Sequence, residues 1–300
     1  FEEIRQRVAE GRWEITGGWF LEPDCILPCG EAFVRQGLYA QRYLKSRFGR
    51  LCTIGSNVDS FGHNHVLPQI LKKSGMDSYV FMRPRLDTPV FVWEGGDGSR
   101  VNAISLPAEY TTWFHDPTVK NIETTLERTK GYDKMPCCYG VGNHGGGPTK
   151  QNIESIRELD QEADIPHLIL STPDEYFRDV KKQGKTLPSV SGDLFHHSSG
   201  CYSAHSEVKR LNRLAENRLI MAEKFSVAAR HWTGGKYPLE KYTEGWKKVL
   251  FNQFHDIMAG TSIEPAYDDA RESYGAALDT AARGLNAAVQ SIYWHIDIPI

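Results

Sequence analysis

Residues 51–64, LCTIGSNVDSFGHN, decide how the first part of the chain folds. A short apolar run, Leu51–Ile54, leads directly into a polar segment that contains Asp59. A run of this length bounded by turn residues is typical of a buried strand. In parallel α/β folds, the polar residues that follow such strands are where chemistry is placed. Asp59 can therefore be a nucleophile, a general base or a metal ligand, or it can cap the next helix.

Similar apolar runs alternate with amphipathic stretches as far as about residue 195. We expect strands at Trp13–Thr16, Leu51–Ile54, Ser78–Met82, Pro89–Trp93, Val101–Leu106, Cys137–Val141 and His167–Leu170. We expect helices at Phe1–Glu10, Glu31–Phe48, Leu67–Lys73, Thr118–Lys130, Lys150–Ala163 and Pro173–Lys182. This alternation favours parallel strands with helices packed outside them, as a barrel or as a doubly wound sheet.

The pattern changes near residue 200, where three long helical stretches begin. They are Ser203–Trp232, Leu239–Met258 and Glu264–Trp294, and their apolar residues recur at steps of three and four. Such a stripe on helices with short connections predicts an antiparallel three-helix bundle. We therefore assign residues 1–199 to an α/β domain and residues 200–300 to the bundle.

The composition excludes several classes of protein. Of the 300 residues, 40% are hydrophobic and 24% are charged, which is ordinary for a globular chain. The formal charge of −3 makes nucleic acid and anionic membranes poor partners, and no apolar run approaches the ~18 residues of a membrane span. Six cysteines, two of them adjacent, are more consistent with reduced thiols than with disulfides, which favours a cytoplasmic protein. A homo-oligomer is compatible with this composition.

Two further segments combine glycines with polar residues. Residues 140–148, GVGNHGGGP, contain a G-x-G-x-x-G pattern that is typical of dinucleotide binding. The next helix begins only after Pro148 and no acidic residue follows the next strand, so this interpretation is weak. Residues 252–262, NQFHDIMAGTS, close the second long helix. His255 there is either a core residue or a neutral imidazole that faces a metal, with its second nitrogen bonded to an acceptor.

Taken together, these segments resemble glycoside hydrolase family 38, the zinc-dependent retaining α-mannosidases. The resemblance covers nearly the whole chain, and its blocks keep their order along the sequence. The blocks are residues 19–24 (WFLEPD), 30–36 (GEAFVRQ), 57–63 (NVDSFGH), 67–71 (LPQIL), 91–99 (FVWEGGDGS) and 252–262.

The resemblance implies roles for individual residues. Asp59 would be the nucleophile that forms a covalent glycosyl-aspartate, and Asp59 and His255 would both bind Zn²⁺. The acid/base loop would contain Asn143 and His144. The residues expected to bind an α-mannoside or a mannose-containing oligosaccharide are Trp19, Asp24, Arg83, Tyr202, Ser203 and Asp256. The implied fold is a partial, barrel-like parallel β/α domain followed by the helical bundle.

The chain departs from the family pattern in two ways. No His-x-Asp pair, which supplies two zinc ligands in the family, precedes Trp19. We therefore expect the 300 residues to be a fragment that lacks two ligands, binds metal weakly and is inactive. Relatives often have Asp where this chain has Asn143, and an amide cannot protonate a leaving oxygen. His144, Asp97 and Glu109 remain candidates for the general acid.

Other functions use the same residue types. In a metal-dependent amidohydrolase or deacetylase the metal would activate water, and Asp59 would be only a base or a ligand. A nicotinamide-dependent oxidoreductase would depend on residues 140–145 alone, and a sugar-binding module would need no catalysis. The mannosidase hypothesis requires that Asp59 and His255 face one shared pocket.

Overall fold

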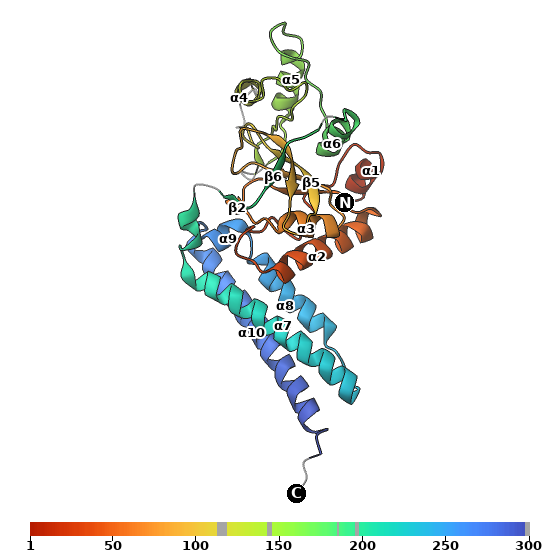
Figure 1. Ribbon diagram of the computed structural model, residues 1–300, viewed down its shortest axis with the longest axis vertical. Coiled ribbons are helices and arrows are strands. Elements are labelled where there is room, and N and C mark those ends of the chain that lie inside the picture. The colour runs from red at the N-terminus through yellow and green to blue at the C-terminus, as the bar shows by residue number, and fades with distance from the viewer. Residues whose placement is uncertain (113–118, 143–145, 185, 196–197, 298–300) are drawn as a thin grey trace. The chain divides into compact units, whose positions relative to one another are not determined.

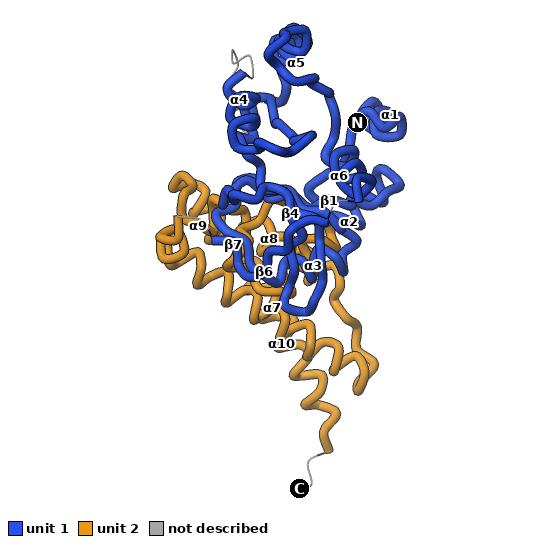
Figure 2. Tube along the Cα trace, turned by 45° about the horizontal axis from the view of Figure 1, so that its top comes forward, with its two compact units in different colours: residues 1–18, 40–197 blue, residues 19–39, 198–300 orange. Residues whose placement is uncertain are grey.

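A computed structural model describes residues 1–112, 119–142, 146–184, 186–195 and 198–297 (Figure 1). The chain divides into two compact units, one of residues 1–18 and 40–197 and the other of residues 19–39 and 198–300 (Figure 2). We call them the α/β unit and the helical unit. Residues 19–39, which the sequence assigns to the α/β domain, thus belong to the helical unit. Helix α2 (Gly30–Phe48) begins in the helical unit and ends in the α/β unit.

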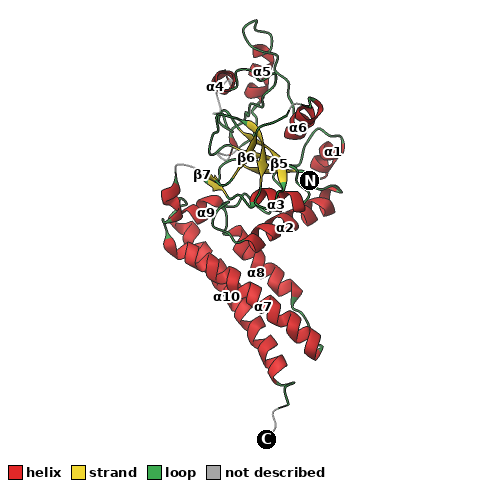
Figure 3. Ribbon diagram, viewed as in Figure 1, coloured by secondary structure: helices red, strands yellow, loops and turns green. Residues whose placement is uncertain are grey.

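A five-stranded sheet forms the centre of the α/β unit (Figure 3). In spatial order its strands are β1 (Ile54–Asn57), β3 (Ser78–Phe81), β5 (Arg100–Ser105), β4 (Val90–Glu94) and β6 (Ser189–Ser191). The neighbours β1, β3 and β5 are parallel, whereas β4 and β5 form an antiparallel hairpin. Among the described residues β1 and β6 are the edges of this sheet. A closed barrel therefore stays a prediction.

The register of the parallel strands aligns their carboxyl ends. Asn57 lies opposite Phe81, which in turn lies opposite Ser105. All four residues of β3 are buried, as expected for a strand covered on both faces. An apolar core packs on the sheet and consists of Ile54, Val80, Met82, Val90, Ile104, Leu106 and Phe177.

Three predicted strands do not form. Residues 137–141 and 167–170 are irregular, and the run near Trp13 makes only an isolated parallel bridge between Gly17 and Gly55. A strand exists only where a second strand lies within hydrogen-bonding distance, about 4.8 Å away. In the described part of the chain residues 137–141 and 167–170 have no paired strand beside them, and the run near Trp13 reaches β1 only at Gly17, so an apolar pattern alone does not make a strand.

The helices of the α/β unit agree more closely with the sequence, because their signals are local. They are α1 (Glu2–Ala9), α3 (Leu67–Lys73), α4 (Val119–Arg128), α5 (Lys150–Leu159) and α6 (Pro173–Lys182). A capping box between Thr149 and Asn152 begins α5. The Thr172 hydroxyl caps α6, which has Pro173 in its first turn. A short antiparallel pair, β2 (Gly62–His63) with β7 (Leu194–Phe195), completes the described elements of this unit.

Besides the first part of α2, the described residues of the helical unit form three long helices and two short ones. The long helices are α7 (Ser206–Thr233), α8 (Leu239–Phe251) and α10 (Glu264–Tyr293), and the short ones are the 3₁₀ helix η2 (Ser199–Tyr202) and α9 (His255–Ala259). Helices α7 and α10 run side by side, and α8 packs against both (Figure 1). Their shared core includes Leu219, Trp246 and Tyr274, all fully buried. Gly234 ends α7 in the left-handed conformation, with φ 71°.

One predicted helix is broken in the structure. The sequence predicts a continuous helix over Leu239–Met258, but α8 ends at Phe251 and α9 begins at His255. The hydrogen bonds shift from the i−4 to the i−3 carbonyl at Gln253 and Phe254. Phe254 is then extended, with φ −48° and ψ 134°. His255 therefore begins a short helix and does not lie at the end of a long one.

Two remaining expectations concern membranes and thiols. In the described ranges, no helix has both the length and the apolar composition needed to cross a membrane. All six cysteines are free thiols, as predicted. Burial, helped by the Glu216 carboxylate, raises the pKa of Cys29 to about 11, and burial raises that of Cys52 to about 11. Both thiols are therefore protonated at neutral pH.

Candidate active site

Asp59 and Arg83 meet at the carboxyl ends of two neighbouring parallel strands. Asp59 lies two residues beyond β1 and Arg83 two residues beyond β3, whose last residues are paired in register. Nη1 of Arg83 donates to the Oδ1 atom of Asp59 and, at 3.1 Å, to its main-chain carbonyl. The Asp59 side chain is 17% exposed. The sequence predicted both residues, and their charge-assisted contact fixes the direction of the carboxylate.

Tyr110 completes this cluster, and the sequence analysis missed it. Its hydroxyl donates to the Oδ2 atom of Asp59 at 3.0 Å. Tyr110 follows β5, the third parallel strand, by five residues. The signal that would have identified it is therefore positional, since residues beyond adjacent parallel strands gather at one edge of the sheet. We call Asp59, Arg83 and Tyr110 the strand-end cluster.

In the helical unit, the segment around Glu22 holds His255. Pro23 and Phe254 form an isolated antiparallel bridge. The Glu22 carbonyl accepts from the main-chain N–H of His255 at 3.3 Å and lies 3.0 Å from its Nδ1 atom. Because a carbonyl only accepts, we assign the proton to Nδ1, so the lone pair of the neutral ring is on Nε2. His255 is 4% exposed, and this contact is the acceptor that the sequence analysis required.

Asp24 lies in the same turn and is fully buried. Its Oδ1 atom accepts from the N–H groups of Ile26 and Leu27 at 2.9 and 2.7 Å, and its own N–H donates to Gln253. Within the described residues, its Oδ2 atom has no hydrogen-bond partner. Burial raises the pKa of this carboxyl, although those two N–H groups and the charge of Lys209 lower it.

The other predicted sugar-binding residues of the helical unit lie in different surroundings. Burial, reinforced by Asp24, raises the pKa of Tyr202, and its hydroxyl is buried without a partner among the described residues. Ser203 is exposed and donates to the Gly200 carbonyl. Asp256 accepts from Thr261, and its Oδ2 atom lies 4.0 Å from Nε2 of His255. Trp19 is 8% exposed and packs edge-on against Phe33, as a core residue does.

The structure describes two of the candidates for the general acid, Asp97 and Glu109. Asn143 and His144 lie outside the described residues. Asp97 lies in the turn before β5, at the amino end of that strand and therefore away from its carboxyl end. The Ser99 N–H, together with Lys73, lowers its pKa, which does not suit an acid. Glu109, whose side chain is 54% exposed, is ion-paired with Arg85.

The donor set fits zinc in kind but not in number. The Asp59 carboxylate and the Nε2 atom of His255 are suitable zinc ligands. In the part of the chain that is described, however, no three His, Cys, Asp or Glu side chains are grouped to hold a metal. Asp59 and His255 belong to different units. The shared pocket therefore stays a prediction.

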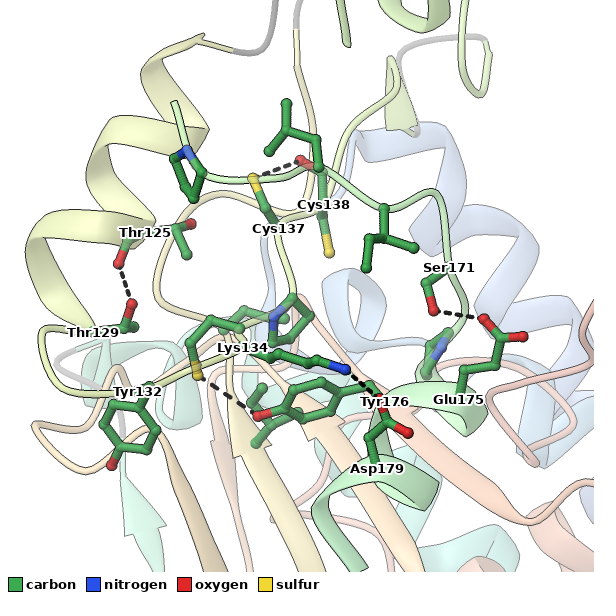
Figure 4. A pocket seen from close by; sticks show the side chains of 18 of the residues that line it. Thr125, Thr129, Tyr132, Lys134, Cys137, Cys138, Ser171, Glu175, Tyr176 and Asp179 are labelled. Carbon is green, nitrogen blue, oxygen red and sulfur yellow. Dashed lines mark hydrogen bonds and ion pairs between the residues drawn. The ribbon is translucent and has the colours of Figure 1, made fainter. Parts of the chain in front are cut away.

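The α/β unit contains a large cavity (Figure 4). Its volume is about 920 Å³, and it lies between α4, α6 and residues 131–139 and 166–173. Its floor is apolar and includes Val80, Ile104 and Leu106. On its wall, Nζ of Lys134 donates to the Asp179 carboxylate at 2.7 Å, so these two charges pair with each other. Tyr110 is the lining residue that also contacts Asp59.

Comparison with protein families gives two matches in sequence order. The family model described as "Glycosyl hydrolases family 38 N-terminal domain" matches residues 1–200. The one described as "Alpha mannosidase middle domain" matches residues 196–292.

Curated proteins with similar sequences carry related names. The chain is 33% identical to Alpha-mannosidase G of Dictyostelium discoideum over 279 residues, which are 90% of this chain and 25% of that protein. It is 30% identical to the Alpha-mannosidase of Saccharomyces cerevisiae, covering 87% and 26% of the two chains. It is 29% identical to human Alpha-mannosidase 2C1, covering 96% and 29%. The chain thus spans about a quarter of the length of these relatives.

Solved structures support the same fold. The chain superposes on an α-mannosidase from Enterococcus faecalis V583 with a TM-score of 0.82 and 20% sequence identity. The match covers 99% of this chain and 36% of that one. A mixed α/β fold with a helical second part is therefore common to both.

Proposed function

Because the chain belongs to glycoside hydrolase family 38, we propose that this protein hydrolyses α-mannosides. The observation that carries the proposal is the strand-end cluster within the segment that matches the family's N-terminal domain. Both oxygens of the Asp59 carboxylate accept hydrogen bonds there, one from Arg83 and one from Tyr110. Such an arrangement keeps a carboxylate charged and aimed in one direction, as a nucleophile requires.

In this proposal Asp59 attacks the anomeric carbon of the mannoside. A bond forms between a carboxylate oxygen and that carbon while the bond to the leaving oxygen breaks, and a general acid protonates the leaving group. Water then releases mannose from the covalent intermediate, with retention of configuration. In a retaining enzyme the acid lies about 5–5.5 Å from the nucleophile. Asp97, at the far edge of the sheet, does not meet this requirement, so His144 and Glu109 remain.

We also propose that Asp59 and His255 bind Zn²⁺ in the complete site. When bound, the metal would gather adjacent sugar hydroxyls and act as a template and Lewis acid. The Glu22 carbonyl lies 3.0 Å from Nδ1 of His255, so Nε2 is the ring atom that would bind the metal. Trp19, Asp24, Tyr202, Ser203 and Asp256 would bind the sugar, together with Arg83.

The remaining parts of the proposal concern architecture and location. We propose a barrel-like catalytic domain over residues 1–199 and an antiparallel three-helix bundle over residues 200–300. Packing of α8 on both α7 and α10 supports the bundle. A cytoplasmic location, an assembly of identical subunits and an inactive isolated chain are predictions from the sequence alone.

Covalent trapping tests the proposed chemistry. A 2-deoxy-2-fluoro-mannosyl fluoride should label the full-length enzyme, and peptide mass spectrometry should find the sugar on Asp59. The Asp59→Asn variant is the matched control and should remain unlabelled. Label on another carboxylate would overturn the assignment of the nucleophile. Rapid turnover of an aryl α-mannoside without any trapped sugar would favour a mechanism in which water attacks directly.

A further inference from the structure

His63 is a fully buried histidine behind the strand-end cluster, and the proposed reaction gives it no role. It lies in β2, four residues beyond Asp59. Its ring packs among three aromatic side chains, with ring centroids 5.6 Å from Tyr79, 4.9 Å from Phe81 and 6.4 Å from Trp93. An apolar side chain would fill this space without the cost of burying two polar nitrogens. The polar contacts of the imidazole therefore require an explanation.

Both ring nitrogens of His63 are engaged. Nε2 lies 2.6 Å from the main-chain carbonyl oxygen of Arg83, and Nδ1 lies 2.9 Å from the hydroxyl of Tyr79. Because the carbonyl only accepts, we assign a proton to Nε2. The Tyr79 hydroxyl also lies 3.0 Å from Oδ1 of Asn57, the last residue of β1. The ring thus contacts Tyr79 within β3 and Arg83 beyond β3 through two different nitrogens.

Arg83 is consequently held at both ends. Its guanidinium contacts the side chain and carbonyl of Asp59, and its own carbonyl accepts from His63. The segment from Asp59 to His63 follows β1, and both of its end residues therefore contact the same arginine. This closed loop restricts the main chain on which the Asp59–Arg83 ion pair is built. A shift of about 1 Å in such a contact can cost about 100-fold in rate.

We propose that His63 is a positioning residue that holds the Arg83 main chain and, through it, the Asp59 carboxylate. The proposal rests on the proposed function, since positioning matters only if Asp59 reacts. The Nε2 atom of the ring holds the main chain, because it donates to the Arg83 carbonyl. The Tyr79 contact at Nδ1 satisfies the second nitrogen and contributes to packing.

Two amide variants separate the nitrogens. In His63→Gln the longer side chain can bring its amide nitrogen to the Nε2 position, which retains the donor to Arg83. In His63→Asn the shorter side chain reaches only the Nδ1 position, so the Arg83 carbonyl loses its partner. Tyr79→Phe removes the other contact and retains the ring. All three variants are made in the full-length protein.

Kinetics with an aryl α-mannoside provide the first measurement. His63→Asn should lower kcat by about 100-fold and change KM by less than about threefold. His63→Gln and Tyr79→Phe should stay within about fivefold of the wild-type kcat. Melting temperatures are measured for all variants, because a purely structural role would make kcat follow stability. Equal losses in the Asn and Gln variants would overturn the proposal.

Labelling of Arg83 with an arylglyoxal, measured by peptide mass spectrometry, does not depend on activity. We expect about tenfold faster labelling in His63→Asn than in wild type, because the freed segment exposes the guanidinium. His63→Gln should be labelled at the wild-type rate. This contrast supports the assignment even if the wild type proves inactive on mannosides, an outcome that would defeat only the proposed function. If His63→Asn does not fold, accelerated labelling in His63→Gln is sufficient to overturn the proposal.

Discussion

Two carboxylates in each unit lie in contrasting surroundings. In the α/β unit, Asp77 accepts from Lys181 at 2.8 Å and Asp59 accepts from Arg83, so both face cations at the ends of strands. In the helical unit, Asp24 and Glu216 are fully buried. The first arrangement stabilises the charged carboxylate, and the second disfavours it.

The pKa directions follow this difference. Burial pushes the pKa of Asp77 upward, but the hydrogen bonds from Lys181 and Ser78 outweigh it and leave the pKa below its ordinary value. Burial raises the pKa of Glu216 despite the hydrogen bond from the Cys29 N–H and the charge of Arg213. Acid should therefore weaken the ionic contacts of the α/β unit, whereas a rise in pH should strain the helical unit. The predictions below test this contrast.

The largest expected effect concerns the strand-end cluster. Arg83→Met retains the length of the side chain but removes its charge, so the Asp59 carboxylate loses its cationic partner. We expect kcat/KM for an aryl α-mannoside to fall by about 100- to 1,000-fold in the full-length enzyme.

Arg100→Met is the matched control for that prediction. It removes an exposed arginine that lies 3.8 Å from Glu94 at the other edge of the sheet, and it should change kcat/KM by less than about threefold. If Arg83→Met retained activity while Asp59→Asn lost it, the nucleophile would not depend on the ion pair. Strand-end pairing would then be a stabilising feature and not a catalytic one.

The next effect concerns the apolar core that supports the helical unit. Leu219 is fully buried, and a Cβ placed at Gly245 would lie 3.2 Å from its methyl group, so the helices are closely packed there. Leu219→Ala should lower the free energy of unfolding by about 3 kcal/mol. Leu239→Ala, at a residue that is 65% exposed, should cost less than about 0.5 kcal/mol. Urea denaturation monitored by tryptophan fluorescence measures both, and equal costs would contradict the observed packing.

The sequence predicts helices better than strands, because the signals for a helix are local and those for strand pairing are not. Helices depend on neighbours three and four residues away, and the expected bounds of α3, Leu67–Lys73, match the structure. The runs at 137–141 and 167–170 have a strand-like pattern but are not paired with a strand in the described structure. Pairing partners are distant in sequence, and a pattern does not specify them.

The candidate site was predictable to a similar extent. Asp59 is identifiable because a carboxylate follows a buried strand. Tyr110 and His63 depend on the register of three strands, which the sequence does not reveal. The break before His255 has an equally distant cause, since its N–H bonds to Glu22, 233 residues earlier. The apolar pattern of residues 239–258 does not indicate that contact.

The smallest expected effect concerns the pH dependence of the helical unit. Between the ordinary Glu value of 4.5 and the raised pKa of folded Glu216, the unfolded chain has lost a proton that the folded chain retains. Stability should therefore fall as pH rises through this window, by at most about 1.4 kcal/mol per pH unit. Glu216→Gln cannot ionise and should flatten that slope, as measured by urea denaturation at a series of pH values.

Asp77→Asn provides the opposite control for that measurement. The pKa of folded Asp77 lies below 3.8, so its contribution is present above that value and is lost on acidification. Because Asp77 and Lys181 are each more than 40% exposed, we expect at most about 0.5 kcal/mol, and less at high salt. If both variants changed the free energy of unfolding in the same pH range, the buried Glu216 and the ion-paired Asp77 would not differ in the way proposed. Opposite ranges would instead show that Asp77 stabilises the fold in its charged form and Glu216 in its neutral form.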